Sequence, residues 1–561
     1  MNQIHGTRKT LSLEFLVYLV VLLAAGLLRF THLGVLPLND HEASLALQAL
    51  HLNRGEQVIL SGEPGYISLT TALFYIFQPT EFTARFWPAL AGTLLVLVPI
   101  FFRKQLGSTN AWILAALLAF DPVLIGVSRS AEGGALALSG LLAAIGFGFN
   151  RRPVWCGLSL GLALAGGPGF WPGMIILAVI LLIFKKGFQH HEGRSLALVA
   201  ASAGITLLVI STLFLTIPQG ISAFGSSFVD YSRSWTGGNR TPLVGVTAAW
   251  VLSVLPLLPF AAWGLIQGLV RGDVGAKLLG IWAGASFILA LANPARQLLD
   301  LYWVSIPLLT LSAIKLADLI TGFTSENRLI FLAEVVLVVA LVVFSFMNAV
   351  NLVNNPLQNQ EEYRNRVIGV ILPLILLLGM TVLLAWGWSG DATRKGLIAG
   401  IVILASFTIL SNSWKAASLG TRPEIEIRRS SGAPVGLGEL MTTVADISRF
   451  KTGIDHRIDV QVVNLPHPSL EWALRNFEQA RFSTVHDSGA SPAIVLTSED
   501  QQPTDSASYR GQKILWTVKP DIGSMKLIDW LKWSLFRTAP EERTELVLWA
   551  RNDLFPGGTI P

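Results

Sequence analysis

Three adjacent side chains near the start of the chain have the types needed for proton transfer. Asp40, His41 and Glu42 lie in the segment PLNDHEASLALQA, just after the first long hydrophobic stretch. A carboxylate at a membrane surface can accept a proton from an attacking hydroxyl group as a general base. Ionisable side chains so close to lipid are costly, and they therefore predict a functional site. A structural role competes, because Asn39 and Glu42 also fit a capping box at a helix N-terminus.

The histidine at position 41 has two possible chemical roles, proton shuttle and metal ligand. His32 and His51 are nearby, but their spacing is not that of a zinc site. The single cysteine, Cys156, excludes an intrachain disulfide and a cysteine metal cluster. We therefore expect neither a metal nor a cofactor.

Arginines in outward-facing segments are candidate ligands for a phosphate group, because a guanidinium binds phosphate in a bidentate manner. The candidates are Arg129, Arg233, Arg240 and Arg296. The alternative is that these arginines lie at the membrane interface and extend their charged ends into water without binding a ligand. Arg85 is expected to form an ion pair with an acidic residue of the same loop and thereby to stabilise that loop. Trp235 is a candidate for stacking on a sugar ring, although tryptophan also accumulates at membrane interfaces for other reasons.

Long apolar stretches must position these residues. The chain has 561 residues, of which 52% are hydrophobic and 14% charged, whereas soluble chains carry about 25% charged residues. Segments of roughly 20 apolar residues predict about thirteen membrane-spanning helices. They lie near residues 11–31, 84–102, 109–127, 132–149, 153–167, 169–185, 195–217, 242–269, 276–292, 300–317, 328–350, 367–388 and 396–412. The break GGPGFWP between the fifth and sixth is also compatible with a re-entrant turn.

Basic residues alternate between the predicted loops and predict the orientation of the chain. Pairs such as Arg103 and Lys104, or Arg151 and Arg152, fall on one side, which should be the cytoplasm. The N-terminus is then cytoplasmic, and segments 32–83, 218–241 and 350–366 face outward. An odd number of spans places the C-terminal part outside as well. The chain is thus expected to be a multi-pass protein of the cell membrane.

The composition changes after residue 412, which divides the chain into a transmembrane domain, 1–412, and a domain of residues 413–561. Four short runs in the second part are typical of buried strands: 460–464, 493–498, 513–518 and 545–550. Two amphipathic segments, 468–477 and 525–536, favour helices. These patterns predict an extracytoplasmic α/β domain. The net charge of +5 is modest, and no nucleic-acid partner is expected.

Several motifs, taken in order, resemble those of the GT-C superfamily of membrane glycosyltransferases. A basic N-terminus and one span precede PLNDHEASLALQA, GEPGYISLTTALFYIF and TEFTARFWPALAG, and DPVLIGVSRSAEG follows the third span. The resemblance points to family 39, with the protein O-mannosyltransferases and the aminoarabinose transferase of lipid A. It covers residues 10–150 and, through RQLLDLYWVSIPLLTLSA, residues 290–315. The segments PSLEWALRNF and ELVLWARNDLF resemble a subgroup associated with flippase activity.

This resemblance implies an enzyme that transfers a sugar from a polyprenyl-phosphate donor to a protein, lipid or glycan acceptor outside the membrane. It implies direct displacement at the anomeric carbon, with a carboxylate base in the first outer loop, arginines on the departing phosphate and no metal. The family pattern is Asp-Glu followed by a small residue. Here Glu42 and Ala43 match, whereas His41 replaces the aspartate and Asp40 lies one position early.

We therefore expect Asp40 to be the base and Glu42 its partner. Because His41 replaces the family's aspartate, a non-catalytic accessory protein in lipid-linked sugar translocation is an alternative. A transporter is a further alternative, although the chain lacks two symmetric halves with broken helices.

Overall fold

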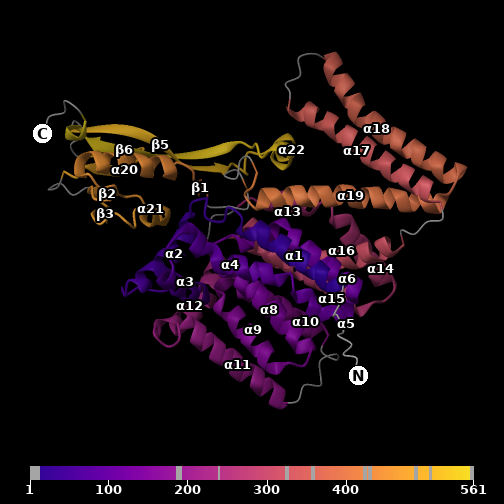
Figure 1. The fold of residues 1–561 in the computed structure, drawn as a ribbon, viewed down its shortest axis with the longest axis horizontal. Helices are drawn as coiled ribbons and strands as arrows, with labels where there is room; N and C mark the ends of the chain where they lie inside the picture. Colours follow the sequence, from indigo (N-terminus) through magenta and orange to yellow (C-terminus); the bar gives the residue numbers. More distant parts are fainter. Residues whose placement is uncertain are drawn as a thin grey trace, which may run out of the picture.

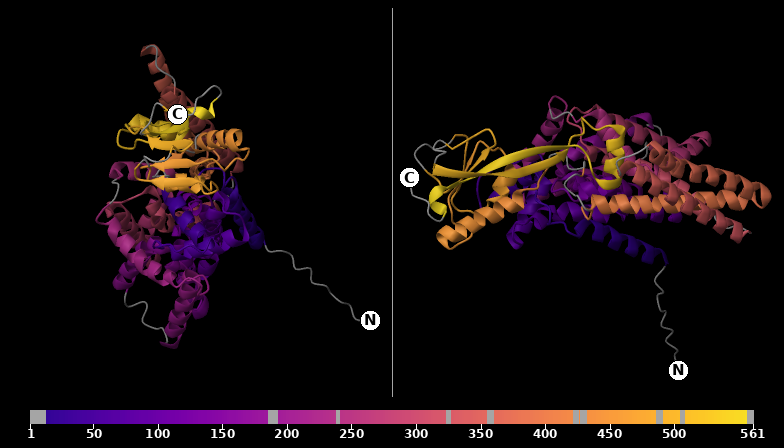
Figure 2. Two further views of the ribbon diagram at one scale, coloured as in Figure 1. Left: turned by 90° about the vertical axis from the view of Figure 1, so that its left-hand side faces the viewer. Right: turned by 90° about the horizontal axis from the view of Figure 1, so that it is seen from above.

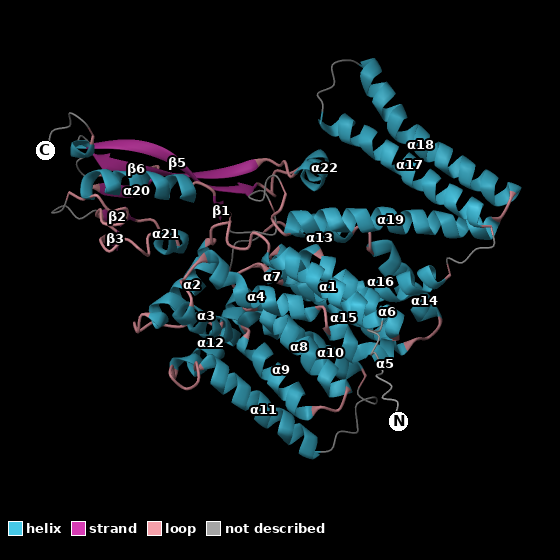
Figure 3. Ribbon diagram, viewed as in Figure 1, coloured by secondary structure: helices cyan, strands magenta, loops and turns pink. Residues whose placement is uncertain are grey.

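The structure is a computed structural model that describes residues 13–184, 193–237, 241–322, 327–354, 360–420, 426, 432–485, 491–503 and 508–555. A bundle of helices is followed by a domain that contains a sheet (Figures 1 and 3). The helices of the bundle are α1 Leu13–Phe30, α2 Asp40–Asn53, α3 Pro64–Ile76, α4 Glu81–Leu95, η1 Val98–Phe102, α5 Arg103–Leu106, α6 Ser108–Phe120, α7 Pro122–Ser128, α8 Gly134–Phe149, α9 Pro153–Ala165, η2 Gly167–Gly169, α10 Phe170–Ile183, α11 Gly193–Ser211, α12 Gln219–Ser234, α13 Leu243–Val254, α14 Leu258–Val270, α15 Val274–Ala292, η4 Leu298–Leu301, α16 Tyr302–Thr321, α17 Arg328–Asn354, α18 Gln360–Gly387 and α19 Gly390–Ala416.

Six helical segments in the described part are long and apolar enough to cross a membrane. They are Glu81–Leu106, Val274–Ala292, Leu298–Thr321, Arg328–Val353, Gln360–Gly387 and Gly390–Ala416. Two bent pairs raise the number to as many as 8, and α8, α9, the segment Gly167–Ile183 and Ser195–Ser211 are shorter apolar helices. The predicted spans therefore correspond to apolar helices, although several are shorter than a membrane is thick or are broken.

The two bent pairs have a local cause in proline. The chain bends by 61° between α6 and α7, and by 87° between α13 and α14. At the first bend Pro122 opens α7, and the Asp121 carboxylate accepts a hydrogen bond of 2.8 Å from the backbone N–H of Leu124. Proline disfavours a helical conformation in the residue before it and fits the first turn of a new helix. Each apolar run that the sequence presents as continuous thus becomes two helices.

Outside the spans, the segments that are predicted to face outward contain helices that hydropathy does not reveal. Residues 32–83 fold into α2 and α3, and residues 218–241 contain α12. The predicted capping box at the start of α2 is present: the Asn39 side chain accepts from the Glu42 backbone N–H, and Glu42 accepts from the Asn39 N–H. These short helices, together with the loops beside them, form the end of the bundle nearest the C-terminal domain (Figure 1).

The C-terminal domain is a mixed six-stranded sheet with helices, in the strand order β1-β5-β6-β4-β2-β3. Its elements are β1 Ala433–Pro434, α20 Leu437–Thr452, β2 Val460–Val463, α21 Pro468–Ala473, β3 Ala480–Ser483, β4 Ile494–Ser498, β5 Tyr509–Pro520, α22 Leu527–Phe536, β6 Glu541–Arg551 and η7 Asn552–Leu554. Strand β2 is parallel to β3 and β4, and the other pairs are antiparallel. All four predicted strands and both predicted helices are present, whereas β1, α20 and β3 were not predicted.

The domain has its own apolar core and is also packed on the bundle. Leu440, Trp516 and their neighbours form the domain core. Trp472 of α21 and Trp530 and Trp533 of α22 belong instead to the apolar cluster of the bundle. The two longest strands reach along the bundle toward α22, and α1 begins at the end of the bundle far from the sheet (Figure 2). Which end faces the cytoplasm stays a prediction.

Candidate functional site

A cavity of about 320 Å³ lies where the loops that are predicted to face outward meet the helices of the bundle. Carboxylates dominate its polar lining, so we call it the acidic cavity. Its ionisable and phenolic side chains are His41, Glu63, Glu132, Asp230, Tyr231, Asp300 and Tyr302. They come from α2, from the residue before α3, from the loop between α7 and α8, and from α12, η4 and α16. Side chains from six parts of the sequence therefore converge on one volume.

His41 is the residue of the predicted triplet that lines this cavity. Its Nε2 lies 3.8 Å from Oε1 of Glu63 and 3.7 Å from Oε2 of Glu132. The Glu63 carboxylate is the main cause that raises the pKa of His41 to about 9, with Glu132 and Glu42 adding to it and burial opposing it. The imidazolium form of His41 therefore faces Glu63 and Glu132 at neutral pH. Its side chain is 59% exposed, so a ligand in the cavity can reach it.

Glu63 is held in place by the backbone of two other segments. Its Oε2 accepts a hydrogen bond of 2.8 Å from the N–H of Gly133. Gly167 has a φ of +83°, and a Cβ there would lie 2.7 Å from Cγ of Glu63. Only glycine adopts this conformation at low cost and leaves room for the carboxylate side chain. The GGPG break between α9 and α10 thus contributes to the wall of the cavity.

The electrostatic environment of Glu132 favours its neutral form. Burial is the main cause that raises the pKa of Glu132 to about 7, with His41 opposing it and Glu63 and Glu42 adding to it. A carboxyl group that is half ionised near neutral pH is suited to accept a proton from a substrate and to release it later. The pKa values of both His41 and Glu132 are raised, and neighbouring groups with perturbed pKa values are common at catalytic sites.

Glu42, by contrast, is buried in a structural ion pair. Nε and Nη2 of Arg85 lie 3.0 and 2.7 Å from its two carboxylate oxygens. The N–H of Ala131 donates to Oε1 at 2.9 Å. Arg85 also donates to the carbonyl oxygens of Leu33, Leu36 and Pro37, which fixes the loop before α2.

Asp40 points away from the cavity and contacts the C-terminal domain. Its Oδ2 lies 2.9 Å from Nδ1 of His467, and its Oδ1 accepts hydrogen bonds from the backbone N–H and the hydroxyl of Ser469. Burial raises the pKa of Asp40, but the hydrogen bonds from His467 and Ser469 outweigh burial and hold that pKa below its usual value. The carboxylate is therefore ionised, and both of its oxygens already accept hydrogen bonds from the C-terminal domain.

The arginines predicted to bind phosphate lie in different environments. Arg129 is buried, and its guanidinium donates to the carbonyl oxygens of Leu28, Arg29, Thr31 and His32 at the end of α1. Arg233 is 76% exposed and lies 3.7 Å from Asp230. Arg240 is outside the described residues.

Arg296 lies in the chain between two residues that line the cavity, Ala295 and Gln297. Its Nε and Nη1 are buried and have no hydrogen-bond acceptor among the described residues. Trp235 is next to the cavity without lining it: its ring packs edge-on against Tyr231, with centroids 6.3 Å apart, and Tyr231 lines the cavity.

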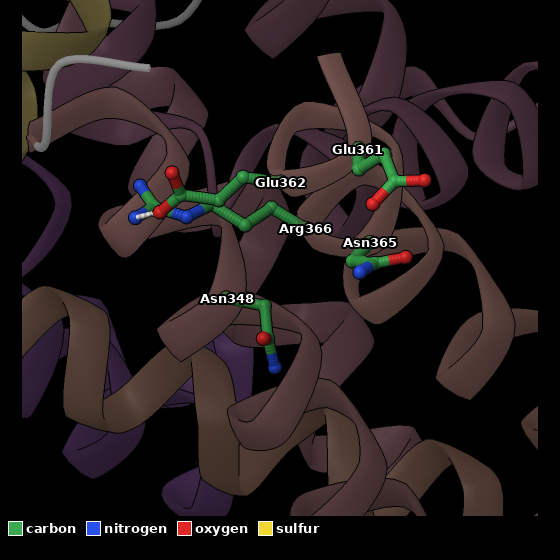
Figure 4. Close-up of a pocket in the computed structure, with 5 residues that line it drawn as sticks. All are labelled: Asn348, Glu361, Glu362, Asn365 and Arg366. Carbon is green, nitrogen blue, oxygen red and sulfur yellow. Dashed lines mark hydrogen bonds and ion pairs between the residues drawn. The ribbon is translucent and has the colours of Figure 1, made fainter. Parts of the chain in front are cut away.

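Other polar side chains in the described part of the chain form no metal site and one further pocket. No group of three or more histidine, cysteine, aspartate and glutamate side chains there is placed to hold a metal ion. A second, more open polar pocket of about 480 Å³ lies between α17 and α18, lined by Asn348, Glu361, Glu362, Asn365 and Arg366 (Figure 4). Glu362 pairs with Arg366 there. None of the predicted site residues lines this pocket.

Glu63, Glu132, Asp230 and Asp300 were not singled out from the sequence. The sequence could have indicated Glu132, because this residue follows a predicted span in the segment SRSAEG, as Asp40 and Glu42 follow the first span. No such indication exists for Asp230 and Asp300, since each is a single acid whose neighbours in the cavity are distant in sequence.

The comparisons with known proteins give the fold. No protein-family model matches the chain, and no curated protein sequence matches it. Its structure is similar to that of ArnT from Cupriavidus metallidurans bound to undecaprenyl phosphate, with a TM-score of 0.54, 14% identity, and coverage of 97% of this chain and 99% of that chain. For ArnT in the apo state the TM-score is 0.52, with 14% identity and coverage of 96% and 98%.

The Archaeoglobus fulgidus oligosaccharyltransferase in the apo form gives a TM-score of 0.47 at 16% identity, covering 84% of this chain and 64% of that chain. ArnT and this oligosaccharyltransferase are GT-C glycosyltransferases. The likeness to ArnT extends over nearly the whole of both chains and confirms the predicted GT-C type of fold, a helical membrane domain followed by a domain with a small sheet.

Proposed function

We propose that this protein is a membrane glycosyltransferase that moves a sugar from a polyprenyl-phosphate donor to an extracytoplasmic acceptor. The acidic cavity is the observation that carries the proposal, because it brings a carboxylate with a pKa of about 7 and an imidazolium to the end of the bundle nearest the C-terminal domain. The shared fold supports it, since ArnT has been seen with undecaprenyl phosphate bound.

In the proposed reaction, Glu132 is the general base. The acceptor hydroxyl oxygen attacks the anomeric carbon, and the bond from that carbon to the phosphate oxygen of the donor breaks. Glu132 takes the hydroxyl proton, and the polyprenyl phosphate leaves with the bonding electrons. His41 lies within 3.7 Å of Glu132 and, as a cation, favours its ionised form. This assignment replaces Asp40 and Glu42 as the base, because their carboxylates are already hydrogen-bonded elsewhere.

The leaving phosphate carries negative charge and requires cations that face it. Arg296 is the first choice, since two of its N–H donors lack an acceptor among the described residues and both its chain neighbours line the cavity. Arg233 is the second, because it is exposed and its ion-pair partner Asp230 is itself a cavity residue. Arg129 is less suited, since four carbonyl oxygens already occupy its guanidinium.

One observation favours the alternative of a non-catalytic accessory protein with the same fold. Glu42 and Asp40, the two carboxylates of the first outer loop, are both engaged in contacts that stabilise the structure. A protein that binds a lipid-linked sugar without transferring it would need the cavity but not a base. Binding and transfer must therefore be measured separately.

Binding of undecaprenyl phosphate to the purified full-length protein tests the donor site. We expect the parent to bind this lipid in preference to phosphatidylglycerol, and Arg296→Gln to weaken binding by about tenfold, as for the loss of a charge-assisted hydrogen bond. Arg364→Gln is the matched control, because Arg364 is exposed on α18. A parent that does not distinguish the two lipids, or equal losses in both variants, would contradict the proposed site.

A further inference from the structure

The carboxylate of Asp40 joins the two domains through the N-terminus of α21. The first turn of a helix has backbone N–H groups without partners inside the helix. His467 is the N-cap residue of α21, and its side chain makes no capping hydrogen bond. Oδ1 of Asp40 accepts instead from the Ser469 N–H, at 3.2 Å. A residue of α2 therefore caps α21, and its negative charge interacts favourably with the positive end of that helix.

Trp472 makes the apolar part of the same contact. Its side chain is 1% exposed and belongs to the apolar cluster of the bundle rather than to the core of its own domain. The indole N–H donates to Oε1 of Glu81 at 2.9 Å, and the ring lies 5.9 Å from that of Phe74. A buried tryptophan with its N–H satisfied is typical of the residues that dominate the energy of an interface.

Arg475 closes the contact on its outer side. Its guanidinium lies over the Trp472 ring at 4.2 Å and donates to the carbonyl oxygen of Pro79 at 3.2 Å. In return, Arg54 at the end of α2 donates to the carbonyl oxygen of Arg475 at 3.1 Å. The segment from His467 to Arg475 is therefore bound at both ends of α2 and at the start of α4, and α21 lies beside α2 in Figure 1.

This contact bears directly on the acidic cavity. Asp40 and His41 are consecutive residues in the first turn of α2, and they point to the C-terminal domain and to the cavity respectively. Any rotation of that turn would move both. We propose that Asp40 is a positioning residue: by binding α21 it fixes the first turn of α2, and it thereby holds the His41 imidazole against Glu63 and Glu132. The effect on sugar transfer rests on the proposed function, whereas the effect on α2 does not.

Hydrogen exchange of the backbone amides tests the positioning without any substrate. In the full-length protein, Asp40→Ala should speed exchange in the first turns of α2 and α21 by about fivefold or more, as expected for loss of a helix cap. Trp472→Ala should do the same. Asp455→Asn is the matched control, because Asp455 lies in the same domain in an exposed pair with Arg449. Unchanged exchange in α2 with both interface variants would overturn the proposal.

The conservative variant and the transfer assay separate positioning from catalysis. Asp40→Asn keeps an oxygen that accepts from Ser469, so it should restore most of the amide protection and most of the transfer rate that Asp40→Ala loses. Asp40→Ala should lower kcat and leave the KM for the donor nearly unchanged. If Asp40→Asn were as inactive as Asp40→Ala while α2 remained protected, Asp40 would be the base and the positioning role would be wrong. If the parent transferred no sugar, the exchange experiment would still show whether the contact of Asp40 with α21 orders the first turn of α2.

Discussion

At the scale of single residues, the partners of each carboxylate separate structural from chemical roles. Glu42 has two N–H groups of Arg85 and the N–H of Ala131 on its oxygens. Glu132 faces the His41 imidazole across 3.7 Å and lines a cavity. A carboxylate whose oxygens already accept several hydrogen bonds is stabilised in its ionised form and is a poor proton acceptor. A carboxyl group whose pKa is raised by burial can take up and release a proton near neutral pH.

The buried pair of Glu42 and Arg85 leads to a prediction about stability. Glu42→Gln leaves a buried guanidinium without its counter-charge, and we expect the unfolding free energy to fall by about 3–5 kcal/mol. The control is Glu14→Gln, which breaks the partly exposed pair of Glu14 with Arg103 and should cost about 0–1 kcal/mol. Thermal unfolding of both variants in detergent measures the difference. Equal melting temperatures would show that the buried pair contributes no more than a surface pair.

The two shifted pKa values predict how transfer depends on pH. Glu132 must be ionised to act as base, so kcat/KM should rise as the pH increases through about 7. His41 must stay protonated, so the rate should fall again as the pH passes about 9. Glu63→Gln removes the main cause of the raised His41 pKa and should move the descending limb to lower pH. A rate that is independent of pH between 6 and 10 would contradict both assignments.

At the scale of elements, small residues allow the last spans to pack closely. A Cβ on Gly396 of α19 would lie 2.7 Å from Cβ of Glu334 in α17, and one on Gly400 would lie 2.8 Å from Cβ of Val338. Glu334 itself is fully buried, and one of its oxygens accepts from the Thr381 hydroxyl of α18 at 2.6 Å. Close backbone approach at glycine and a polar contact between helices are both characteristic of packing in membranes.

Substitution of these glycines tests that packing. Gly396→Val should push α19 away from α17 and lower stability by about 1–3 kcal/mol, as overpacking does. Gly379→Val is the control, since no atom lies within 4 Å of a Cβ placed there on α18. Melting temperatures in detergent provide the comparison. A loss for Gly379→Val as large as that for Gly396→Val would mean that the glycine contact does not define the packing.

At the scale of the whole molecule, the sequence predicts the helices and strands better than it predicts the contacts between them. Apolar runs located the spans, and strands such as Val460–Val463 were predicted because a buried strand is a short apolar run. Helix α2 is short and mixed in polarity, so hydropathy does not detect it. The acidic cavity is beyond sequence reasoning for a further reason: its residues run from His41 to Trp303, and nothing in their spacing specifies that they converge. The same holds for Asp40, whose partners His467 and Ser469 lie in another domain.

The central claim is that the acidic cavity transfers sugar with Glu132 as the base. Its most direct test is the rate of transfer from a polyprenyl-phosphate sugar by the parent, by Glu132→Gln and by Glu361→Gln, each in proteoliposomes with membrane extract as the acceptor source. Glu361 is a matched control, because it is an exposed carboxylate on α18 outside the cavity. We predict that Glu132→Gln binds undecaprenyl phosphate as the parent does but transfers about 10²–10⁴ times more slowly, as for the loss of a general base, while Glu361→Gln keeps the parental rate. Transfer by Glu132→Gln at the parental rate would contradict the account.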